Sequence, residues 1–435
     1  MARRKSIGIR RELTSLVSTR ELNQYAEWTG LVKRRRKIEP MALFWTVVLG
    51  FAVGKERSLT GLRRAYERCT GTTLVPSAFY DRFSHAMAEF FRTVAMVMME
   101  RLGETEGKLG GVLAGFRDVL LTDSTLVRLH ELLERSFPAS RTNHTKAAVK
   151  LHVVMSVRGG GARSVKMTSG RQHDGPVLKV GRWVKDHLML FDLGYFRYGL
   201  FDQIDRFGGY FISRLKQSAN PLVVEDLQEG GGGRGLIGRQ LLDALKGLKR
   251  DELDLIVEVP FRRRAYAGRR SGAKCTLRLV GTRDKVTREW HLYLTNIPAE
   301  RLSPRQVAAV YACRWEIELL FKEMKSDYRL DEVHTSKRHI VETLLYASVV
   351  TLLVSRRLMG AVREKLRSTA RQIPEARWGA MFAGFATSAL ELVLAPAALA
   401  REMAVWLEAM LLHEALDPNL SRPLLRERVE KAGTW

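Results

Sequence analysis

Four polar residues between Tyr311 and Lys325 are spaced so that they fall on one side of a helix. In the segment YACRWEIELLFKEMK, Tyr311, Arg314, Glu318 and Lys325 follow the pattern Y-x2-R-x3-E-x6-K. At about 100° per residue, and with Tyr311 at 0°, the other three lie at roughly 300°, 340° and 320°. One carboxylate is thus expected beside a hydroxyl, a guanidinium and an ammonium group. Arg314 and Glu318 are also four residues apart, so a solvent-facing ion pair is an alternative explanation for part of the pattern.

The other faces of this helix have simpler expected roles. Its apolar residues recur at intervals of three and four, which predicts a stripe packed into a core. They are Ile317, Leu320, Phe321 and Met324. Glu316 and Glu323 lie at about 140° and 120°, away from the polar row, and are predicted to be solvated. The helix is expected to begin at Pro304 and to run to about Lys325.

Two aspartates elsewhere in the chain follow short apolar runs that predict buried strands. Asp123 follows Val119–Leu121, and Asp192 follows Leu188–Phe191. Sites in α/β proteins form at the carboxyl ends of strands, so these carboxylates can converge with Glu318. Carboxylate oxygens suit hard divalent cations, and a pair of such cations can promote phosphodiester cleavage. Taken singly, each aspartate is more simply explained as a turn or capping residue.

Together these motifs resemble the Asp-Asp-Glu transposases of the insertion-sequence-four type, which carry a YREK signature. The helix matches that signature at every spacing, LLTDST matches the motif of the first acid, and FDLGYF matches that of the second. The motifs occur in the family's order, and the resemblance covers about residues 110–345. It implies that Asp123, Asp192 and Glu318 are the catalytic acids and bind two Mg²⁺ ions, for which Mn²⁺ can substitute.

The resemblance also implies roles for residues near the acids. Tyr311, Arg314 and Lys325 match the family's DNA-contacting set. Arg314 is the strongest phosphate ligand expected among them, because a guanidinium can bind phosphate in a bidentate manner. His152 and the pair His173-Asp174 lie in the catalytic half but have no motif of their own, so a structural or supporting role is expected for all three.

Three further residues are carried over from the family, and each has an open alternative. Trp290, in REWHLYLTNIP, occupies the place where related enzymes present a tryptophan to a flipped base. Stacking on an aromatic ring is physically reasonable, and packing within a small strand core is the alternative. Arg214 and Lys216, in FISRLK, lie where the family approaches DNA phosphates, whereas a solvated strand end is the alternative.

The order of expected elements indicates an α/β fold with helical regions at both ends. A short helix pair near the N-terminus is compatible with helix-turn-helix DNA binding or with an ordinary helical hairpin. Short apolar runs then predict a mixed sheet, with a hairpin across Gly159–Gly161, a helical link at Pro176–His187 and a small antiparallel section at Leu253–Leu294. The resemblance implies a ribonuclease-H-like catalytic domain interrupted by a β-strand insertion. The expected divisions are 1–105, 106–216, 217–303, 304–345 and 346–435.

The charge of the chain favours a nucleic-acid partner. Its 435 residues include 72 Lys and Arg against 47 Asp and Glu, so the formal net charge is +25. Such an excess attracts polyanions through counterion release, although a basic protein with no special partner is the alternative. The basic residues form clusters along the whole chain, which suggests a long contact track. The clusters lie at Arg3–Arg11, Lys33–Lys37, Arg262–Lys274 and Arg356–Arg371.

Other features exclude several classes of protein. Three scattered cysteines are too few for a disulfide framework or a zinc cluster, and they fit an intracellular setting. The apolar stretch Met381–Ala400 contains Glu391 and Pro396, so a buried helix pair is favoured over a membrane span. Gly230–Gly233 is expected to be a flexible turn and not a phosphate loop, because no Gly-Lys-Ser/Thr follows.

The interpretation that unites these features is a cut-and-paste transposase acting on double-stranded DNA. The family implies a hairpin intermediate, and a homodimer is expected because two element ends must be paired. One alternative is a metal-dependent nuclease or resolvase that hydrolyses DNA without strand transfer. Another is an inactive, DNA-binding relic of a transposase.

Overall fold

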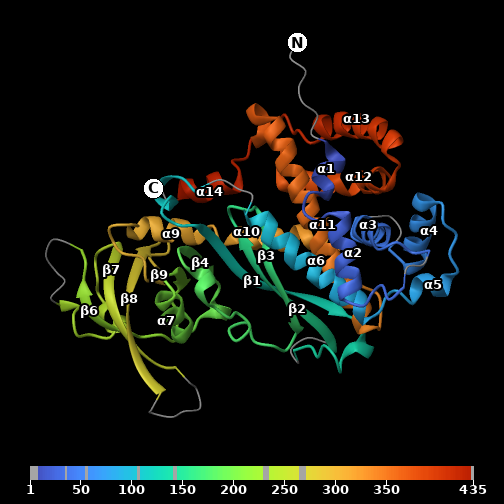
Figure 1. Cartoon of the computed structure of the whole chain (residues 1–435). Helices are drawn as coiled ribbons and strands as arrows, with labels where there is room; N and C mark the ends of the chain where they lie inside the picture. Colours follow the sequence, from blue (N-terminus) through green and yellow to red (C-terminus); the bar gives the residue numbers. More distant parts are fainter. Residues whose placement is uncertain are drawn as a thin grey trace.

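The computed structural model describes residues 8–34, 37–53, 57–104, 108–140, 145–228, 235–263 and 271–432. These residues form a large mixed sheet with a body of helices packed over one part of it (Figure 1). Parts of three basic clusters and the expected glycine turn lie outside the described residues. They are Arg3, Arg4, Lys5, Arg35, Arg36, Arg264, Arg269, Arg270 and Gly230–Gly233.

Five strands have the arrangement of the ribonuclease-H-like fold. Strands β1, β2 and β3 form an antiparallel meander, and β4 and β5 continue the sheet beyond β1, parallel to it and to each other. This arrangement confirms the mixed sheet expected from the sequence, including the hairpin between β2 and β3. The strands are β1 Asp118–Leu129, β2 Ala147–Ser156, β3 Gly161–Ser169, β4 His187–Phe191 and β5 Tyr210–Arg214.

Side chains of these strands pack into two cores, one on each face of the sheet. Val119 and Leu121 of β1 belong to one core, whereas Leu120 between them belongs to the other. Every residue of β4 is buried, because this central strand is covered on both faces. The alternation of β1 therefore places Asp123 on the same face as Val119 and Leu121.

Within the described residues, the inserted strands extend the same sheet to nine strands. They are antiparallel to one another, and β9 pairs with β5 so that Ser213 lies opposite Leu294. The small antiparallel section expected from the sequence is thus continuous with the sheet of β1–β5, and it pairs the edge that β5 would otherwise expose. The elements are β6 Leu222–Asp226, α8 Leu241–Ala244, β7 Glu252–Arg262, β8 Gly272–Arg283 and β9 Trp290–Thr295.

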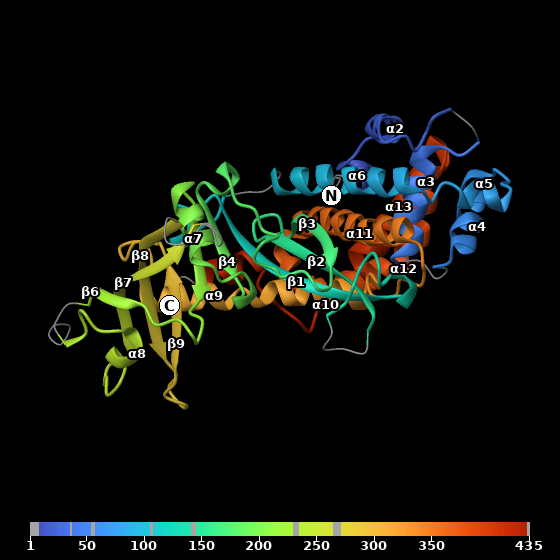
Figure 2. The same cartoon turned by 90° about the horizontal axis from the view of Figure 1, so that it is seen from below.

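Helices from the two ends of the chain form one helical body. Helix α6 packs along α11, α3 packs against α11 and α12, and both α6 and α11 contact β3 (Figure 2). The hydroxyl of Thr351 donates to the carbonyl of Val48 at 2.6 Å, which joins α11 to α3. The helices are α1 Ile9–Thr14, α2 Thr19–Trp28, α3 Pro40–Phe51, α4 Leu59–Thr70, α5 Pro76–Tyr80, α6 His85–Glu104, α11 Arg338–Lys365, α12 Glu375–Leu394, α13 Ala397–Glu414 and α14 Leu425–Ala432.

One of these helices, α11, is long and apolar enough to cross a membrane. However, 83% of its most apolar window is buried inside the protein, as in the core helix of a soluble domain. The stretch Met381–Ala400 forms most of α12 and the start of α13, with a break at Pro396. This is the helix pair that the sequence predicted.

The long helix expected over residues 304–325 is divided in two. Helix α9 spans Pro304–Ala312, and α10 spans Trp315–Ser326. Between them, the main-chain N–H groups of Cys313 and Arg314 bond to carbonyls three residues back, which tightens the turn. The predicted apolar stripe of α10 is buried, as expected.

The helical link predicted at Pro176–His187 is wrong. The crossover from β3 to β4 contains only a short 3-10 turn, η3, at Arg182–Val184. Pro176 and Gly181 bracket a stretch that is too short to nucleate a helix. Helix α7, at Tyr198–Arg206, follows β4 and packs against β5 and β7.

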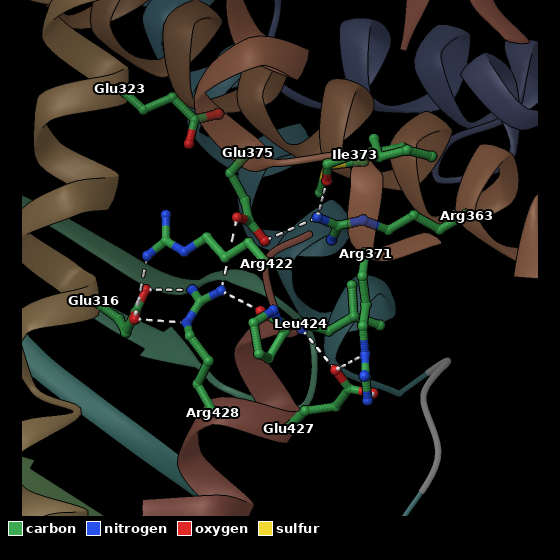
Figure 3. A network of polar contacts seen from close by, with 12 residues as sticks. Glu316, Glu323, Arg363, Arg371, Ile373, Glu375, Arg422, Leu424, Glu427 and Arg428 are labelled. Carbon is green, nitrogen blue, oxygen red and sulfur yellow. Dashed lines mark hydrogen bonds and ion pairs between the residues drawn. The ribbon is translucent and has the colours of Figure 1, made fainter. Parts of the chain in front are cut away.

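The prediction that Glu316 and Glu323 are solvated is also wrong. Glu323 is 6% exposed and pairs with Arg356 of α11. Glu316 accepts hydrogen bonds of 2.9 and 2.6 Å from Arg428 of α14. Figure 3 shows both glutamates on α10 facing the C-terminal helices, which are connected by further ion pairs. The angular position on a helix cannot reveal that a remote segment covers that face.

Candidate active site

Asp123 lies in β1, directly after the last residue that pairs with the parallel strand β4. Strands β1 and β4 are paired up to Thr122 and Phe191, after which β4 ends and β1 continues to Leu129 beside β2. The expectation that Asp123 ends a strand is therefore wrong, because its antiparallel partner prolongs β1. Asp192 does follow the last residue of β4. Asp123 directly follows Thr122, and Asp192 directly follows Phe191. Because Thr122 and Phe191 are paired across the two strands, the two aspartates lie side by side at the carboxyl end of β4.

Helix α10 brings Glu318 to Asp123, because α10 packs against β1. Arg314, directly before α10, joins the two acids. Its Nη1 lies 3.3 Å from Asp123 Oδ2, and its Nη2 lies 2.6 Å from Glu318 Oε1. Glu318 also lies in the first turn of α10, where the helix dipole favours a carboxylate. The ion pair expected between Arg314 and Glu318 is present, and it faces the sheet instead of open solvent.

The carboxylate of Asp192 has no hydrogen bond or ion pair within the described part of the chain. The residue before it is held by Tyr311, whose hydroxyl donates to the carbonyl of Phe191 at 3.0 Å. Burial raises the pKa of Tyr311 to about 12, so the hydroxyl remains a donor. Tyr311 also packs against Tyr293, with ring centroids 5.1 Å apart. Through this bond α9 supports the position of Asp192.

The three acids repel one another electrostatically. Burial raises the pKa of Asp123 to about 6, and the negative charges of Asp192 and Glu318 act in the same direction. The N–H of Ser124, at 2.7 Å, and the charge of Arg314 lower this pKa but do not compensate. Above this pKa, three carboxylates face a single guanidinium. A partly buried excess of negative charge of this kind favours binding of a cation.

The three carboxylates are suitable ligands for a divalent cation, but in this conformation their oxygens do not surround a common metal position. Hard cations prefer carboxylate oxygens, which three separate elements supply here. Among the described residues, no three carboxylate, imidazole or thiol groups lie close enough together to hold a metal ion. Instead, Arg314 lies between Asp123 and Glu318 and compensates their charge. Metal binding by these acids therefore requires the guanidinium to leave at least one of them.

A fourth acid, Asp174, contacts residues close to Asp123 and Asp192. No sequence motif had marked it. Its Oδ1 accepts a hydrogen bond of 2.9 Å from the hydroxyl of Ser124, the neighbour of Asp123, and lies 3.2 Å from Lys150 Nζ. Asp174 also packs closely on Gly194, where a Cβ atom would meet Asp174 Oδ2 at 2.9 Å. The glycine in FDLGYF therefore permits this close approach, and it was the one local signal for the contact.

His152 lies beside Asp174 on the neighbouring strand β2. Burial lowers its pKa to about 4, so the imidazole is neutral at physiological pH. Its Nε2 lies 2.8 Å from the hydroxyl of Thr168, and its Nδ1 lies 3.3 Å from that of Tyr195. These contacts are consistent with the supporting role expected for His152.

The other cationic residues predicted to contact DNA lie near the acids. Arg214 ends β5, which is parallel to β4, and Lys216 follows in an exposed turn. Lys325 lies in the last turn of α10, about 10 Å along the helix axis from Glu318. Within the described residues, none of the three side chains has a carboxylate partner. Their contact with DNA stays a prediction.

Trp290 begins β9, which is antiparallel to β5, and so lies beyond the carboxyl end of β5. The guanidinium of Arg283 lies 4.5 Å from the centre of the indole ring. The ring is half-buried against the second core, but its Nε1 is buried with no hydrogen-bond partner. Base stacking by Trp290 therefore stays a prediction, with strand packing as its alternative.

A ribonuclease-H-like sheet with clustered acids on β1, after β4 and on a following helix defines a class of enzymes that act on phosphodiesters. The sequence profile described as "Transposase DDE domain" matches residues 114–354. The chain belongs to this family, and the sequence prediction of a transposase enzyme is confirmed. Membership of the family also implies dependence on a divalent metal.

Relatives of known type match most of the chain. It is 24% identical over 389 residues to the transposase for insertion sequence element IS231F of Bacillus thuringiensis subsp. israelensis, covering 82% of this chain and 80% of the relative. It is 22% identical over 365 residues to the transposase for insertion sequence element IS1151 of Clostridium perfringens, covering 77% of each. The cryo-EM structure of the piggyBac transposase synaptic complex with hairpin DNA aligns with a TM-score of 0.45 and 12% identity, over 95% of this chain and 85% of that one.

Proposed function

We propose that this chain excises an insertion sequence from double-stranded DNA in the bacterial cytoplasm and joins it to a new target. Asp123, Asp192 and Glu318 act as the catalytic acids and hold two Mg²⁺ ions, for which Mn²⁺ substitutes. When bound, such ions activate the attacking oxygen and stabilise the leaving oxygen of the phosphodiester. The freed 3′-hydroxyl attacks the opposite strand, which gives a hairpin. A second water then hydrolyses the hairpin and regenerates the 3′-hydroxyl, which attacks the target DNA.

The observation that carries this proposal is the convergence of acids from remote segments on one guanidinium. Asp123 and Arg314 are 191 positions apart in the chain, yet they form an ion pair on the catalytic face of the sheet. Asp192 lies within electrostatic range of Asp123 from the adjacent strand. A structural ion pair alone gives no reason for a third, unpaired carboxylate beside it.

We infer that Arg314 changes partners during the reaction. Without metal and DNA, its guanidinium compensates the charges of Asp123 and Glu318. A DNA phosphate offers the same planar group two acceptor oxygens, so it can replace the carboxylates when cations bind them. Lys325, Arg214 and Lys216 then hold the phosphates on either side of the cleaved bond.

The proposed reaction is testable with purified full-length protein and DNA that carries the element ends. Those ends are identifiable near the gene as short inverted repeats bounded by direct duplications. In Mg²⁺ the protein should cut at the ends and join pre-cut ends to target DNA, and chelation of the metal should abolish both steps. Cleavage without joining supports the nuclease or resolvase alternative, whereas binding without cleavage supports the inactive relic.

A homodimer is the assembly that we propose, because two ends must be paired. Helix α13 exposes Leu399, Val405 and Trp406. Neighbouring apolar side chains on a surface mark interaction sites, and a second copy of the chain is the proposed partner. Mass photometry of the cleavage reactions should show two chains in each complex with paired ends. One chain per complex would contradict the dimer.

Replacing Trp290 by alanine is expected to slow hairpin formation about tenfold and to change first-strand nicking little. Stacking of a base on an aromatic ring is worth roughly 1–3 kcal/mol, and only the second step requires an extruded base. Gels that resolve nicked and hairpin products measure both rates. Trp290→Phe keeps a ring and should retain most of the activity. Equal slowing of both steps by Trp290→Ala would assign the side chain to strand packing.

A further inference from the structure

A cavity of about 380 Å³ lies on the face of the sheet opposite to the acids. Thr122 and Val154 contribute to its wall, and β1 turns Thr122 away from the face that carries Asp123. The crossover from β3 to β4, which contains the short turn η3, forms another part of the wall. Four residues of that crossover, between positions 177 and 183, line the cavity.

The charged side chains that line this cavity are all cationic. Arg163 and Lys166 of β3 and Lys179 of the crossover line it, and no lining residue is an aspartate or a glutamate. Lys166 and Lys179 are exposed, and in the described part of the chain neither ammonium group has a carboxylate partner. Cations that are not compensated within the protein favour an anionic ligand.

The interior of the cavity suits a planar, partly apolar group. Val177, Leu178 and the indole of Trp183 form its apolar wall. Trp183 is 37% exposed, and its orientation is set by a hydrogen bond of 3.3 Å from Nε1 to the carbonyl of Lys179. Thr122 also lines the cavity and is 1% exposed, and its buried hydroxyl has no hydrogen-bond partner among the described residues. An unsatisfied buried hydroxyl is costly unless a ligand or a water bonds to it.

We propose that this cavity binds a single nucleotide, with the base against Trp183 and the phosphate at Lys166 and Lys179. Its volume lies within the range of about 300–1,000 Å³ that is usual for small-molecule sites. Stacking on an aromatic ring combined with cationic phosphate contacts is the usual mode of binding unpaired nucleotides.

The occupant that we infer is an unpaired nucleotide of the DNA on which the enzyme acts, and this choice rests on the proposed function. Thr122 precedes Asp123, and Tyr195, which also lines the cavity, is three residues beyond Asp192. The cavity and the acids therefore share β1 and the segment after β4. A strand end held at the acids can place a nearby unpaired nucleotide in the cavity, and a free mononucleotide has the same chemistry.

Calorimetry without metal separates this site from catalysis. The full-length protein is titrated with deoxyadenosine monophosphate, deoxyadenosine and inorganic phosphate. We expect Trp183→Ala to weaken binding of the mononucleotide about tenfold, and Trp28→Ala, which changes an exposed tryptophan of α2, to leave it unchanged. The double variant Lys166→Gln/Lys179→Gln alters exposed residues that do not support the core, and it should weaken the mononucleotide more than deoxyadenosine. No binding, or equal binding by all variants, overturns the site.

A second titration distinguishes DNA from a free nucleotide as the occupant. Duplexes with a single-stranded 3′ overhang carry the fluorescent base 2-aminopurine at successive overhang positions. The proposal expects a fluorescence change at one position, lost in Trp183→Ala and reversed by deoxyadenosine monophosphate. If the mononucleotide binds but no overhang position responds, the DNA assignment is overturned. Because neither titration requires cleavage, loss of catalytic activity and failure of this site are distinguishable.

Discussion

Replacing Glu318 by glutamine is expected to lower the rate of DNA cleavage about a thousandfold while binding of end DNA is retained. Glutamine keeps the size of the side chain but removes the charge that a divalent cation requires. Metal-assisted catalysis supplies several kcal/mol to such reactions, and each 1.4 kcal/mol corresponds to about a tenfold change in rate. Binding should persist, because loss of a negative charge near a phosphate does not weaken that contact. Single-turnover cleavage and gel-shift assays measure the two effects.

A matched control for this variant lies two residues away on the same helix. Glu316→Gln removes a carboxylate of α10 that bonds to Arg428 and does not face the sheet. Its cleavage rate should stay within a few-fold of the parent. Asp192→Asn should behave as Glu318→Gln does, because Asp192 has no partner in the described structure that the change could disrupt. Normal cleavage by either active-site variant in Mg²⁺ would refute the assignment of the acids.

The largest effect on stability is expected from Arg278→Met in the inserted strands. Arg278 donates to both carboxylate oxygens of Asp254 at 2.7 Å and to the carbonyls of Ile297, Pro298 and Leu302 at 3.1, 3.2 and 2.8 Å. Its removal leaves a buried carboxylate and three carbonyls without this donor. Breaking a buried pair from one side costs about 3–5 kcal/mol of the free energy of unfolding. Urea denaturation of the purified protein measures this loss.

Two comparisons make the Arg278 prediction specific. The double variant Arg278→Met/Asp254→Leu also removes the carboxylate that the single variant leaves buried and unpaired. It should therefore recover much of the stability lost by the single variant. Arg288→Met breaks an exposed pair with Asp251 of similar chemistry, and it should cost less than about 1 kcal/mol. If the double variant is less stable than the single one, the unpaired carboxylate of Asp254 is not the cause of the lost stability. Because Arg278 anchors the segment before α9, the same change should also disturb the helix that carries Tyr311.

The local elements of the site were predictable because each depends on a few neighbouring residues. The period of 3.6 residues placed Arg314 and Glu318 on one face of α10 and buried its apolar stripe. The apolar run before Asp192 predicted β4, which ends at the residue before that acid. Glycine and turn residues also placed the hairpin between β2 and β3.

Predictions failed where a remote segment decided the local outcome. The strand β1 continues past Asp123 because its backbone remains paired with that of β2, which is almost thirty positions away in the chain at this point. Glu323 is buried because α11 places Arg356 against it, which no property of α10 reveals. Asp174 had no motif, and its role depends on the packing of two loops around Gly194.

The sequence by itself therefore determined the family to which the chain belongs, and it predicted the three acids and their order, since motif spacing records local geometry. Tertiary structure alone decided that Arg314 links Asp123 to Glu318, that the inserted strands continue the catalytic sheet and that the two terminal regions share one helical body. The physical reason is that these contacts join residues tens to hundreds of positions apart. Burial and charge compensation at such contacts depend on how the whole chain folds. The periodicity of a helix or strand, in contrast, depends only on residues that are close in the sequence.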